Sequence, residues 1–167
     1  MRLFIAINFN ETVKTQIIQV QDVLREHSLK GNFTLPENIH LTLVFFGELP
    51  ENKIDSIKKI ISQVEFEPFQ ITFTHTGNFE RDDGQLFWLG IEQCDEILRV
   101  QKKLASIFLE SGFKIENRKF TPHLTLSRKT ITKSVFKKRN LDIKSTVEKI
   151  SLMKSERINN KLTYTEI

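Results

Sequence analysis

Hydrophobic and polar positions follow two different periods along the first half of the chain. A short apolar run with β-branched residues opens the sequence and is typical of a buried strand. Apolar positions with helical spacing follow Asn10, which is a candidate N-cap. Alternation of side chains between two faces, up to Gly47, then indicates a second strand. The predicted elements are a strand at residues 3–8, a helix from residue 11 to about 27, a short extended piece around Phe33 within a connection at 31–36, a strand at 39–46, a helix from Pro50 to about Gln63 and a strand from 69 towards Gly77.

The second half repeats this alternation of strands and helices. Residues 81–84 have turn composition, and Gly112 stands where a C′ residue would end a helix. The predicted elements are a strand at 86–91, a helix at 95–111, a strand from 123, a short basic helix near 133–138, a strand near 147–153, a turn at Asn159 and Asn160, and a last strand at 162–165.

The tetrapeptide His-Leu-Thr-Leu occurs twice, at residues 40–43 and 123–126, with the histidines 123 − 40 = 83 positions apart. Alternation on an extended strand places the histidine and the threonine on one face and the two leucines on the other. The first copy continues this pattern, with His40, Thr42 and Val44 on one face and Leu41, Leu43 and Phe45 on the opposite face.

Subtracting 83 from the residue numbers also maps the elements of the second half onto those of the first. The strand at 86–91 falls on the strand at 3–8, and the helix at 95–111 falls on the helix that follows Asn10. No linker or low-complexity stretch separates the halves. We therefore predict a single domain over residues 1–167 with an internal duplication, in approximate half-units 1–80 and 84–167.

Composition narrows the class of protein but does not identify a function. The chain of 167 residues is 39% hydrophobic and 28% charged, which is ordinary for a globular domain. Cys94 is the single cysteine, so no internal disulfide can form, and a reducing, cytoplasmic location is expected. The amino terminus is too short and too polar for a signal peptide or a membrane span. A net charge of +4 mildly favours anionic partners such as RNA.

The two tetrapeptides suggest proton-transfer chemistry at a shared pocket. The leucines belong to the core, whereas packing gives little reason for a polar face made of histidine and threonine. A strand histidine is more often a structural hydrogen-bonding residue, and a duplication could preserve such a role in both copies. A metal site is disfavoured, because neither histidine has an Asp, Glu or Cys at ligand spacing and a threonine hydroxyl is a poor ligand.

With these motifs the chain resembles the 2H phosphoesterases, and within them the RNA 2′,3′-cyclic phosphodiesterases, historically called 2′-5′ RNA ligases. The resemblance covers nearly the whole chain. The family often has tryptophan in place of Phe33, leucine in place of Phe46, and glycine in place of the last turn's Asn160-Lys161. The matching segments are Met-Arg-Leu-Phe-Ile-Ala-Ile at the start, 36–39 and 45–48 around the first motif, 118–122 and 127–128 around the second, and 152–155 near the end.

The resemblance implies an α+β fold in which two pseudo-symmetric lobes, each an antiparallel sheet flanked by helices, meet at a central active-site cleft. It also implies hydrolysis of RNA or nucleoside 2′,3′-cyclic phosphates to 2′-phosphates without a metal or other cofactor. His40 would be the proton donor and His123 the proton acceptor, with Thr42 and Thr125 holding the phosphate oxygens. Further substrate contacts are expected from Arg128, Ser127, Phe33 and Phe46, although core packing is the default for a phenylalanine.

The remaining candidates have simpler interpretations. His27 ends a helix at the surface, His75 lacks a threonine partner and is expected to be structural, and the basic set Lys133, Lys137, Lys138 and Arg139 is expected to be solvated, with RNA backbone contact as the second option. The alternative functions are cleavage of 2′-5′ linked oligonucleotides or of ADP-ribose cyclic phosphate, RNA ligation, and RNA binding without turnover. We expect a monomer that does not bind membranes.

Overall fold

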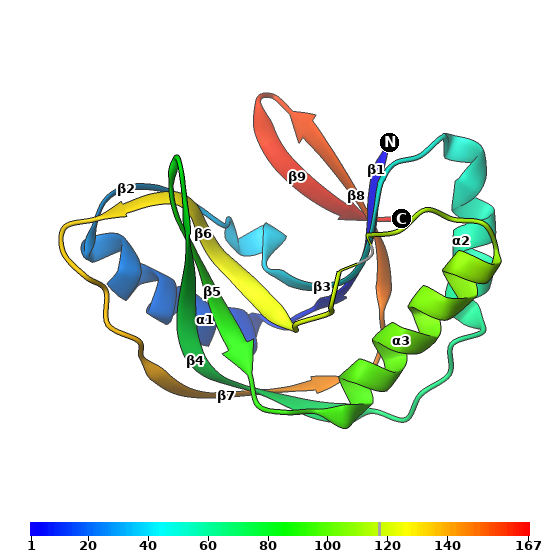
Figure 1. Ribbon diagram of the computed structural model, residues 1–167, viewed down its shortest axis with the longest axis horizontal. Coiled ribbons are helices and arrows are strands. Elements are labelled where there is room, and N and C mark those ends of the chain that lie inside the picture. The colour runs from blue at the N-terminus through cyan, green and yellow to red at the C-terminus, as the bar shows by residue number, and fades with distance from the viewer. Residues whose placement is uncertain (117) are drawn as a thin grey trace.

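Two antiparallel sheets, flanked by helices, make up the protein (Figure 1). The computed structural model describes residues 1–116 and 118–167. The four-stranded sheet has the order β3 (His40–Glu48), β1 (Arg2–Asn8), β8 (Ser151–Ile158) and β9 (Lys161–Glu166). The five-stranded sheet has the order β2 (Ser28–Phe33), β6 (His123–Thr132), β5 (Gly84–Ile91), β4 (Phe69–Arg81) and β7 (Asn140–Val147). The predicted α+β class with two antiparallel sheets is confirmed.

The helices begin and end close to the predicted positions, and residues at two of their ends explain these boundaries. Helix α1 (Glu11–Glu26) starts behind Asn10, whose side-chain oxygen accepts a 2.9 Å hydrogen bond from the Val13 amide. A 3₁₀ turn at Glu51–Lys53 leads into α2 (Ile54–Ser62). Helix α3 (Asp95–Glu110) is followed by Gly112 with φ of +80°, a backbone conformation that favours glycine. A second 3₁₀ turn, Pro36–Asn38, precedes the first motif.

Each of the two long helices follows a strand of one sheet and packs against the other sheet. Helix α1 follows β1 of the four-stranded sheet but contacts β2 and β7 of the five-stranded sheet, and α3 follows β5 but contacts β3. Both sheets combine strands from the two halves of the sequence. One large hydrophobic core contains residues of both, among them Leu41 and Leu124 at 0% exposure. The two sheets are therefore interwoven in sequence, and each takes strands from both predicted half-units, residues 1–80 and 84–167.

Equivalent strands pair in the same way around each motif. Strand β3 lies beside β1 with Thr42 opposite Ala6 and His40 opposite Asn8. Strand β6 lies beside β5 with Thr125 opposite Trp88 and His123 opposite Gly90. Strands β8 and β4 then follow on the far side of β1 and β5. Each motif strand thus pairs with the strand that opens its half of the sequence, but β3 is an edge strand whereas β6 also pairs with β2.

Two predictions about local structure are wrong, and a third, the short extended piece around Phe33, is part of a longer strand. Residues 133–138 are not helical: residues 133 and 134 form a bend, and the chain from 135 to 139 has no regular secondary structure. The end of this segment is held against β4, where the Arg139 amide donates to Thr76 Oγ1 at 2.8 Å and the Thr76 amide donates to the Arg139 carbonyl at 3.0 Å. The strand expected at 147–153 is two strands, since the chain passes from β7 to β8, and so from one sheet to the other, over residues 148–150. The predicted connection at 31–36 begins inside strand β2, which pairs with β6 at the edge of the five-stranded sheet.

The alternation on β3 also changes where a bulge interrupts its pairing with β1. Ile5 pairs with Val44 and Ala6 with Thr42, so Leu43 is an extra residue between two consecutive pairs. Leu43 and Val44 consequently both point into the large core, at 3% and 4% exposure. Phe45 packs instead with the small cluster of Phe4, Ala6 and Met153 on the opposite face of the sheet. The expected faces of Val44 and Phe45 are therefore exchanged.

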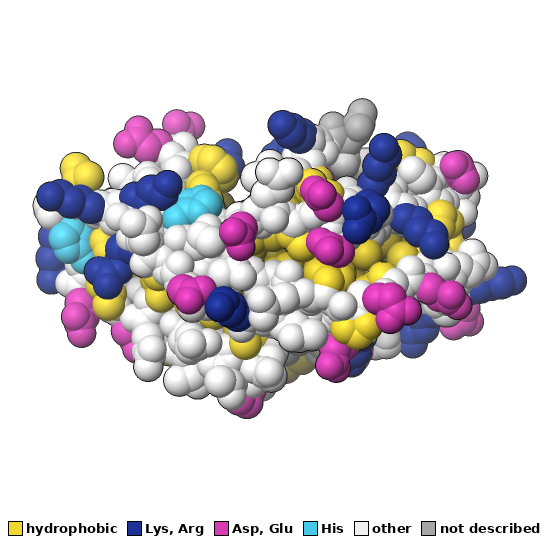
Figure 2. All heavy atoms as spheres, turned by 90° about the horizontal axis from the view of Figure 1, so that it is seen from below, with side chains coloured by type: hydrophobic (Ala, Val, Ile, Leu, Met, Phe, Trp, Pro, Cys, Tyr) yellow, Lys and Arg dark blue, Asp and Glu magenta, His cyan; other side chains and the backbone are white. Residues whose placement is uncertain are grey.

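The face of the molecule opposite the β8–β9 hairpin carries charged side chains of both signs (Figure 2). Hydrophobic side chains line a hollow in the right half of this view, and acidic and basic groups surround it. Among the described residues, this face therefore presents no continuous basic surface of the kind that would attract a nucleic acid backbone.

Candidate active site

The two motif strands come together where the sheets meet. Strands β3 and β6 belong to different sheets but contact one another. Arg128 and His123 both lie near enough to His40 for a positive charge on either side chain to lower the pKa of His40. The leucines of both motifs are buried in the core, while His40, Thr42 and Thr125 are half-buried and His123 is exposed. The separation of leucines from polar residues that the sequence predicts is present in both copies.

His40 is fixed on both sides of its ring. Its Nδ1 lies 2.7 Å from the Asn38 carbonyl oxygen, which can only accept a hydrogen bond, so Nδ1 carries the proton. Its Nε2 lies 2.9 Å from the Thr42 hydroxyl. In the neutral ring the hydroxyl donates to Nε2, and in the charged ring Nε2 donates to the hydroxyl. Proton exchange with a substrate at His40 is therefore assigned to Nε2.

His123 is oriented by the same kind of hydrogen bond. Its Nδ1 donates to the Thr121 carbonyl at 2.7 Å, again a main-chain oxygen two residues before the histidine. No hydrogen bond to its Nε2 occurs among the residues that the structure describes. In both imidazoles a main-chain oxygen fixes the proton on Nδ1, and Nε2 points away from the backbone contact. The geometry suits two groups that exchange protons through Nε2.

The environments of the two histidines differ. Burial lowers the pKa of His40 below its ordinary value, and the positive charges of Arg128 and His123 act in the same direction. The hydrogen bond to the Asn38 carbonyl opposes this shift of the pKa, because it stabilises the charged ring. His40 is consequently neutral at pH 7 in the free protein.

Asn38 ties the first motif to the β8–β9 hairpin. Its side chain is 4% exposed, donates to the Leu162 carbonyl at 2.8 Å and accepts from the Tyr164 amide at 3.1 Å. The same residue supplies the carbonyl that orients His40. A buried amide with both ends bonded holds its segment firmly. Asn38 therefore links the position of the His40 ring to strand β9.

Aromatic rings enclose His40 on the four-stranded sheet. The rings of Phe4 and Tyr164 lie 5.0 and 5.1 Å from the His40 ring, and they also contact one another in an edge-on arrangement. Burial raises the pKa of Tyr164, so its phenol remains protonated at neutral pH. Phe4, Tyr164 and Asn38 were not predicted as site residues, and the one signal for them in the sequence is the position of Asn38 two residues before the motif.

On the five-stranded sheet, Trp88 is the cross-strand neighbour of Thr125 and shares its face. The next pair along β5 and β6 on that face is Gly90 and His123. Trp88 is the only tryptophan in the chain, yet it was not predicted as a site residue, because the sequence pattern of its strand is typical of a strand buried on both faces. The two motifs therefore have different surroundings, with Ala6 beside Thr42 and an indole beside Thr125.

The other predicted contact residues divide into two groups. Arg128 is exposed and close enough to influence both His40 and Tyr164, which brings it to the site. Ser127 is at 0% exposure and accepts a 2.7 Å hydrogen bond from the Thr130 hydroxyl, so its hydroxyl faces the interior. Phe46 is 8% exposed and packs on Phe108 and Phe113 of the core.

The structure does not support a substrate contact for Ser127 or Phe46, because burial in the core leaves them almost no accessible surface. Phe33 is partly buried, with the Arg25 guanidinium 4.6 Å from the centre of its ring. This contact lies on β2 and α1 and does not involve either histidine.

Neither a metal cluster nor a membrane helix is found in the described parts of the chain. Over residues 1–116 and 118–167, no group of three or more His, Cys, Asp or Glu side chains is arranged to hold a metal ion. The two longest helices, α1 and α3, have 16 residues each, and no helix within the same ranges is long and apolar enough to cross a bilayer.

Comparison with known proteins identifies the family. Residues 11–159 match the model of the 2′-5′ RNA ligase superfamily. A Thermotoga maritima protein named RNA 2′,3′-cyclic phosphodiesterase is 37% identical over 131 residues, which cover 77% of this chain and 70% of that protein. A Methanothermobacter thermautotrophicus protein of the same name is 29% identical over 100% of this chain and 96% of its own length.

Solved structures agree with this assignment. The Escherichia coli LigT crystal structure complexed with 3′-AMP has a TM-score of 0.86 and 26% identity, and the match covers 99% of this chain and 94% of LigT. A Thermus thermophilus protein, TT0787, shares the fold at a TM-score of 0.85 with 24% identity, over 100% of this chain and 95% of its own. On its sequence and its fold, the chain belongs to the 2′-5′ RNA ligase superfamily, within the 2H phosphoesterases.

Proposed function

We propose that the protein is an RNA 2′,3′-cyclic phosphodiesterase that opens the cyclic phosphate at an RNA or nucleoside end and leaves a 2′-phosphate. The relatives that carry this name align over most of the chain. The observation that carries the proposal is the matched pair of imidazoles. Each is held through Nδ1 by a main-chain oxygen at 2.7 Å, and each has a threonine two residues later on the same strand face.

In the proposed reaction a water oxygen attacks phosphorus while the bond from phosphorus to the ribose 3′ oxygen breaks. Nε2 of His123 takes a proton from the water, and Nε2 of His40 gives its proton to the leaving 3′ oxygen. The 2′ ester bond remains, so the product is the 2′-phosphate, and the two histidines end the cycle in exchanged protonation states. Thr42, Thr125 and Arg128 would donate hydrogen bonds to the non-bridging oxygens, where negative charge builds up.

The lowered pKa of His40 bears directly on its proposed role as the acid. A ring that is neutral in the free protein must gain a proton before or during binding. A cyclic phosphate carries a negative charge, and placing this charge beside the half-buried ring favours the imidazolium. We therefore propose that the substrate itself raises the pKa of His40, so that the acid is formed chiefly in the complex.

The proposed acid, base and phosphate-binding groups are all side chains of this chain, which supports a reaction that needs no metal. One chain supplies both motifs, which supports a monomer as the active form. Cys94 is buried and free, and this agrees with a reducing compartment such as the cytoplasm.

The test is a comparison of three substrates with the purified protein: a nucleoside 2′,3′-cyclic phosphate, a 2′-5′ linked dinucleotide and ADP-ribose 1″,2″-cyclic phosphate. We expect the first to be turned over with the highest kcat/KM and to give only the 2′-phosphate by phosphorus NMR. A 3′-phosphate product, or a higher kcat/KM on either of the other two compounds, would contradict the proposal. Binding of RNA without turnover of any of the three would identify a non-catalytic RNA-binding module.

A further inference from the structure

A second set of side chains lies on the same face of the five-stranded sheet as His123. Cross-strand pairing continues from β6 through β5 to β4, which places His75 opposite Gly90 and Gly77 opposite Trp88. Residues paired in this way share a face, and neighbouring strands are about 4.8 Å apart. His75 is therefore two strands, or about 10 Å, from His123 along this face.

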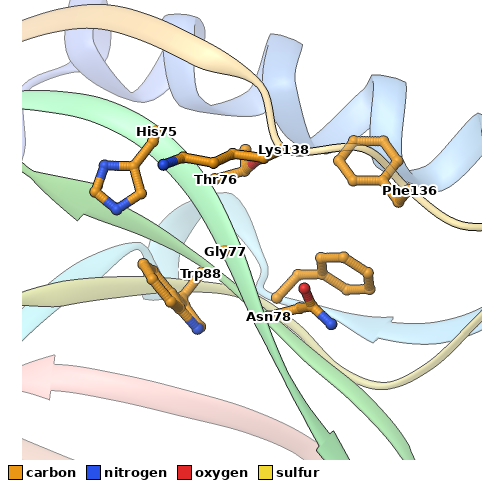
Figure 3. A pocket seen from close by; sticks show the side chains of 8 residues that line it. His75, Thr76, Gly77, Asn78, Trp88, Phe136 and Lys138 are labelled. Carbon is orange, nitrogen blue, oxygen red and sulfur yellow. The ribbon is translucent and has the colours of Figure 1, made fainter.

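Two adjoining cavities open beside the cross-strand residues His123, Gly90 and His75. The larger one has a volume of about 310 Å³ and is lined by His75, Trp88, Asn78, Phe136 and Lys138 among others (Figure 3). The smaller one, of about 160 Å³, shares His75 and Trp88 and extends to Thr121 and Pro122, directly before His123. The volume of the larger cavity is at the lower end of the range for ligand sites. Together the cavities connect the surroundings of His123 with the 133–139 segment.

The aromatic rings of Trp88 and His75 form walls of the cavities. Each ring lies over a glycine, Gly77 or Gly90, where a larger residue would clash with it. A Cβ atom on Gly77 would lie 2.2 Å from the Trp88 indole, and one on Gly90 would lie 2.4 Å from the His75 ring. The two rings meet edge to face with centroids 5.6 Å apart. Burial lowers the pKa of His75, and the charge of Lys138 lowers it further, so the ring is neutral at pH 7. Neutral aromatic walls of this kind stack with nucleobases.

Lys138 supplies a positive charge at the same cavity. In Figure 3 its ammonium group extends towards His75 across the cavity wall. Within residues 1–116 and 118–167 no salt bridge involves Lys138, whereas eight ion pairs form elsewhere. An ammonium group that faces a cavity without a carboxylate partner is suited to bind an anion such as a phosphodiester.

We propose that this cavity binds the nucleotide on the 5′ side of the one that carries the cyclic phosphate, with its base against Trp88 and His75 and its phosphodiester at Lys138. The inference rests on the proposed function, because the reacting phosphate defines the start of the RNA chain. Its consequence is a substrate preference: the end of an RNA strand is bound in two places, and a mononucleotide is bound in one.

The kinetic test measures the ratio of kcat/KM for the dinucleotide ApA 2′,3′-cyclic phosphate to that for adenosine 2′,3′-cyclic phosphate. We expect a ratio of at least about 5 in the wild type, since stacking of one base contributes about 1–3 kcal/mol. Lys138→Ala and Trp88→Leu should each lower the ratio severalfold, and Trp88→Phe should largely restore it. Lys137→Ala, which changes the neighbouring charge, should leave the ratio unchanged.

A binding test keeps the inference separate from turnover. Trp88 is the only tryptophan in the sequence, so the tryptophan emission reports on the surroundings of this one residue. Titration with ApA 3′-phosphate should change the emission in the wild type and at higher concentrations only in Lys138→Ala, whereas 3′-AMP should have a much smaller effect. Equal responses to both ligands, or a kcat/KM ratio near 1 in the wild type, would overturn the inference. Failure to hydrolyse either cyclic phosphate, with the fluorescence response intact, would overturn only the proposed function.

Discussion

Nδ1 of His40 lies 2.7 Å from the backbone oxygen of Asn38, and the side chain of Asn38 is in turn bonded to strand β9 at both ends. The orientation of the His40 ring is thereby coupled to a hairpin that is more than a hundred residues away in sequence. The second histidine has the same backbone contact, through Thr121, but without a buried side chain to support it.

We predict that Asn38→Ala lowers both stability and turnover. The Leu162 carbonyl and the Tyr164 amide lose their partner, which should lower the free energy of unfolding by about 1–3 kcal/mol. The turn that carries the Asn38 carbonyl loosens, so kcat should fall while KM changes little. Urea denaturation and steady-state kinetics measure the two effects.

Thr121→Ala is the matched control, because the carbonyl that holds His123 belongs to the backbone and is retained. Its kcat should stay close to that of the wild type. A fully active Asn38→Ala protein that has lost stability would show that Asn38 supports the fold without positioning His40.

The pKa of His40 should respond to Arg128. Burial is the main cause of its lowered pKa, and the Arg128 charge adds to the effect. Arg128→Ala removes a positive charge, so the pKa of His40 should rise towards the ordinary value of about 6.5. NMR titration of the histidine ring protons measures this shift, and an unchanged or lower pKa would contradict it.

The same pKa gives a sign for the dependence of stability on pH. A histidine whose pKa is lower in the folded than in the unfolded state binds fewer protons when folded. Stability should therefore fall as the pH drops from about 6.5 to the folded pKa of His40, and should be unaffected by this ring above about pH 7. His75 acts in the same direction, so His40→Gln should reduce the acid-induced loss of stability without abolishing it.

Phe46 should matter for stability and not for substrate binding. It is 8% exposed between Phe108 and Phe113, so Phe46→Ala leaves a cavity and should cost about 3–5 kcal/mol of unfolding free energy. Phe46→Leu, which fills most of the space, should cost less. KM for a cyclic nucleotide should be the same in both variants and the wild type, and a large rise in KM for Phe46→Leu would restore Phe46 as a contact residue.

Gly77→Ala should displace Trp88, because the added Cβ would lie 2.2 Å from the indole. We expect altered tryptophan fluorescence and a loss of stability. Gly112→Ala is a useful comparison: among the described residues no atom lies within 4 Å of its added Cβ, but its φ of +80° is unfavourable for alanine. That variant should lose about 1 kcal/mol of stability with its fluorescence unchanged.

Local patterns were sufficient to predict most of the elements and the central pair of motifs. The helix that begins after Asn10 and the helix that ends two residues before Gly112 carry their boundary signals in adjacent residues. The motif leucines are buried because strand alternation forces them to the face opposite the histidine. These features depend on spacing over a few residues and are therefore readable from one sequence.

Features that depend on distant partners were not predictable in this way. The 133–139 segment does not form a helix, because its last residue bonds to Thr76 of β4, and Phe45 changes face because β1 and β3 pair through a bulge. Asn38 and Tyr164 meet only because β9 returns to the first motif. Ser127 follows the second motif directly, yet a hydrogen bond with Thr130 turns its hydroxyl inwards.

The central claim is that His40 and His123 together perform metal-independent acid–base catalysis. It is tested most directly by hydrolysis of adenosine 2′,3′-cyclic phosphate in the presence of EDTA by the wild type, His40→Ala, His123→Ala and, as a control, His27→Ala, whose ring contacts Ser134 and Phe136 away from the motifs. We predict full wild-type activity in EDTA, a loss of about 10²-fold or more in each motif variant and nearly normal activity in His27→Ala. Wild-type activity that requires added metal, or substantial turnover by either motif variant, would contradict the account.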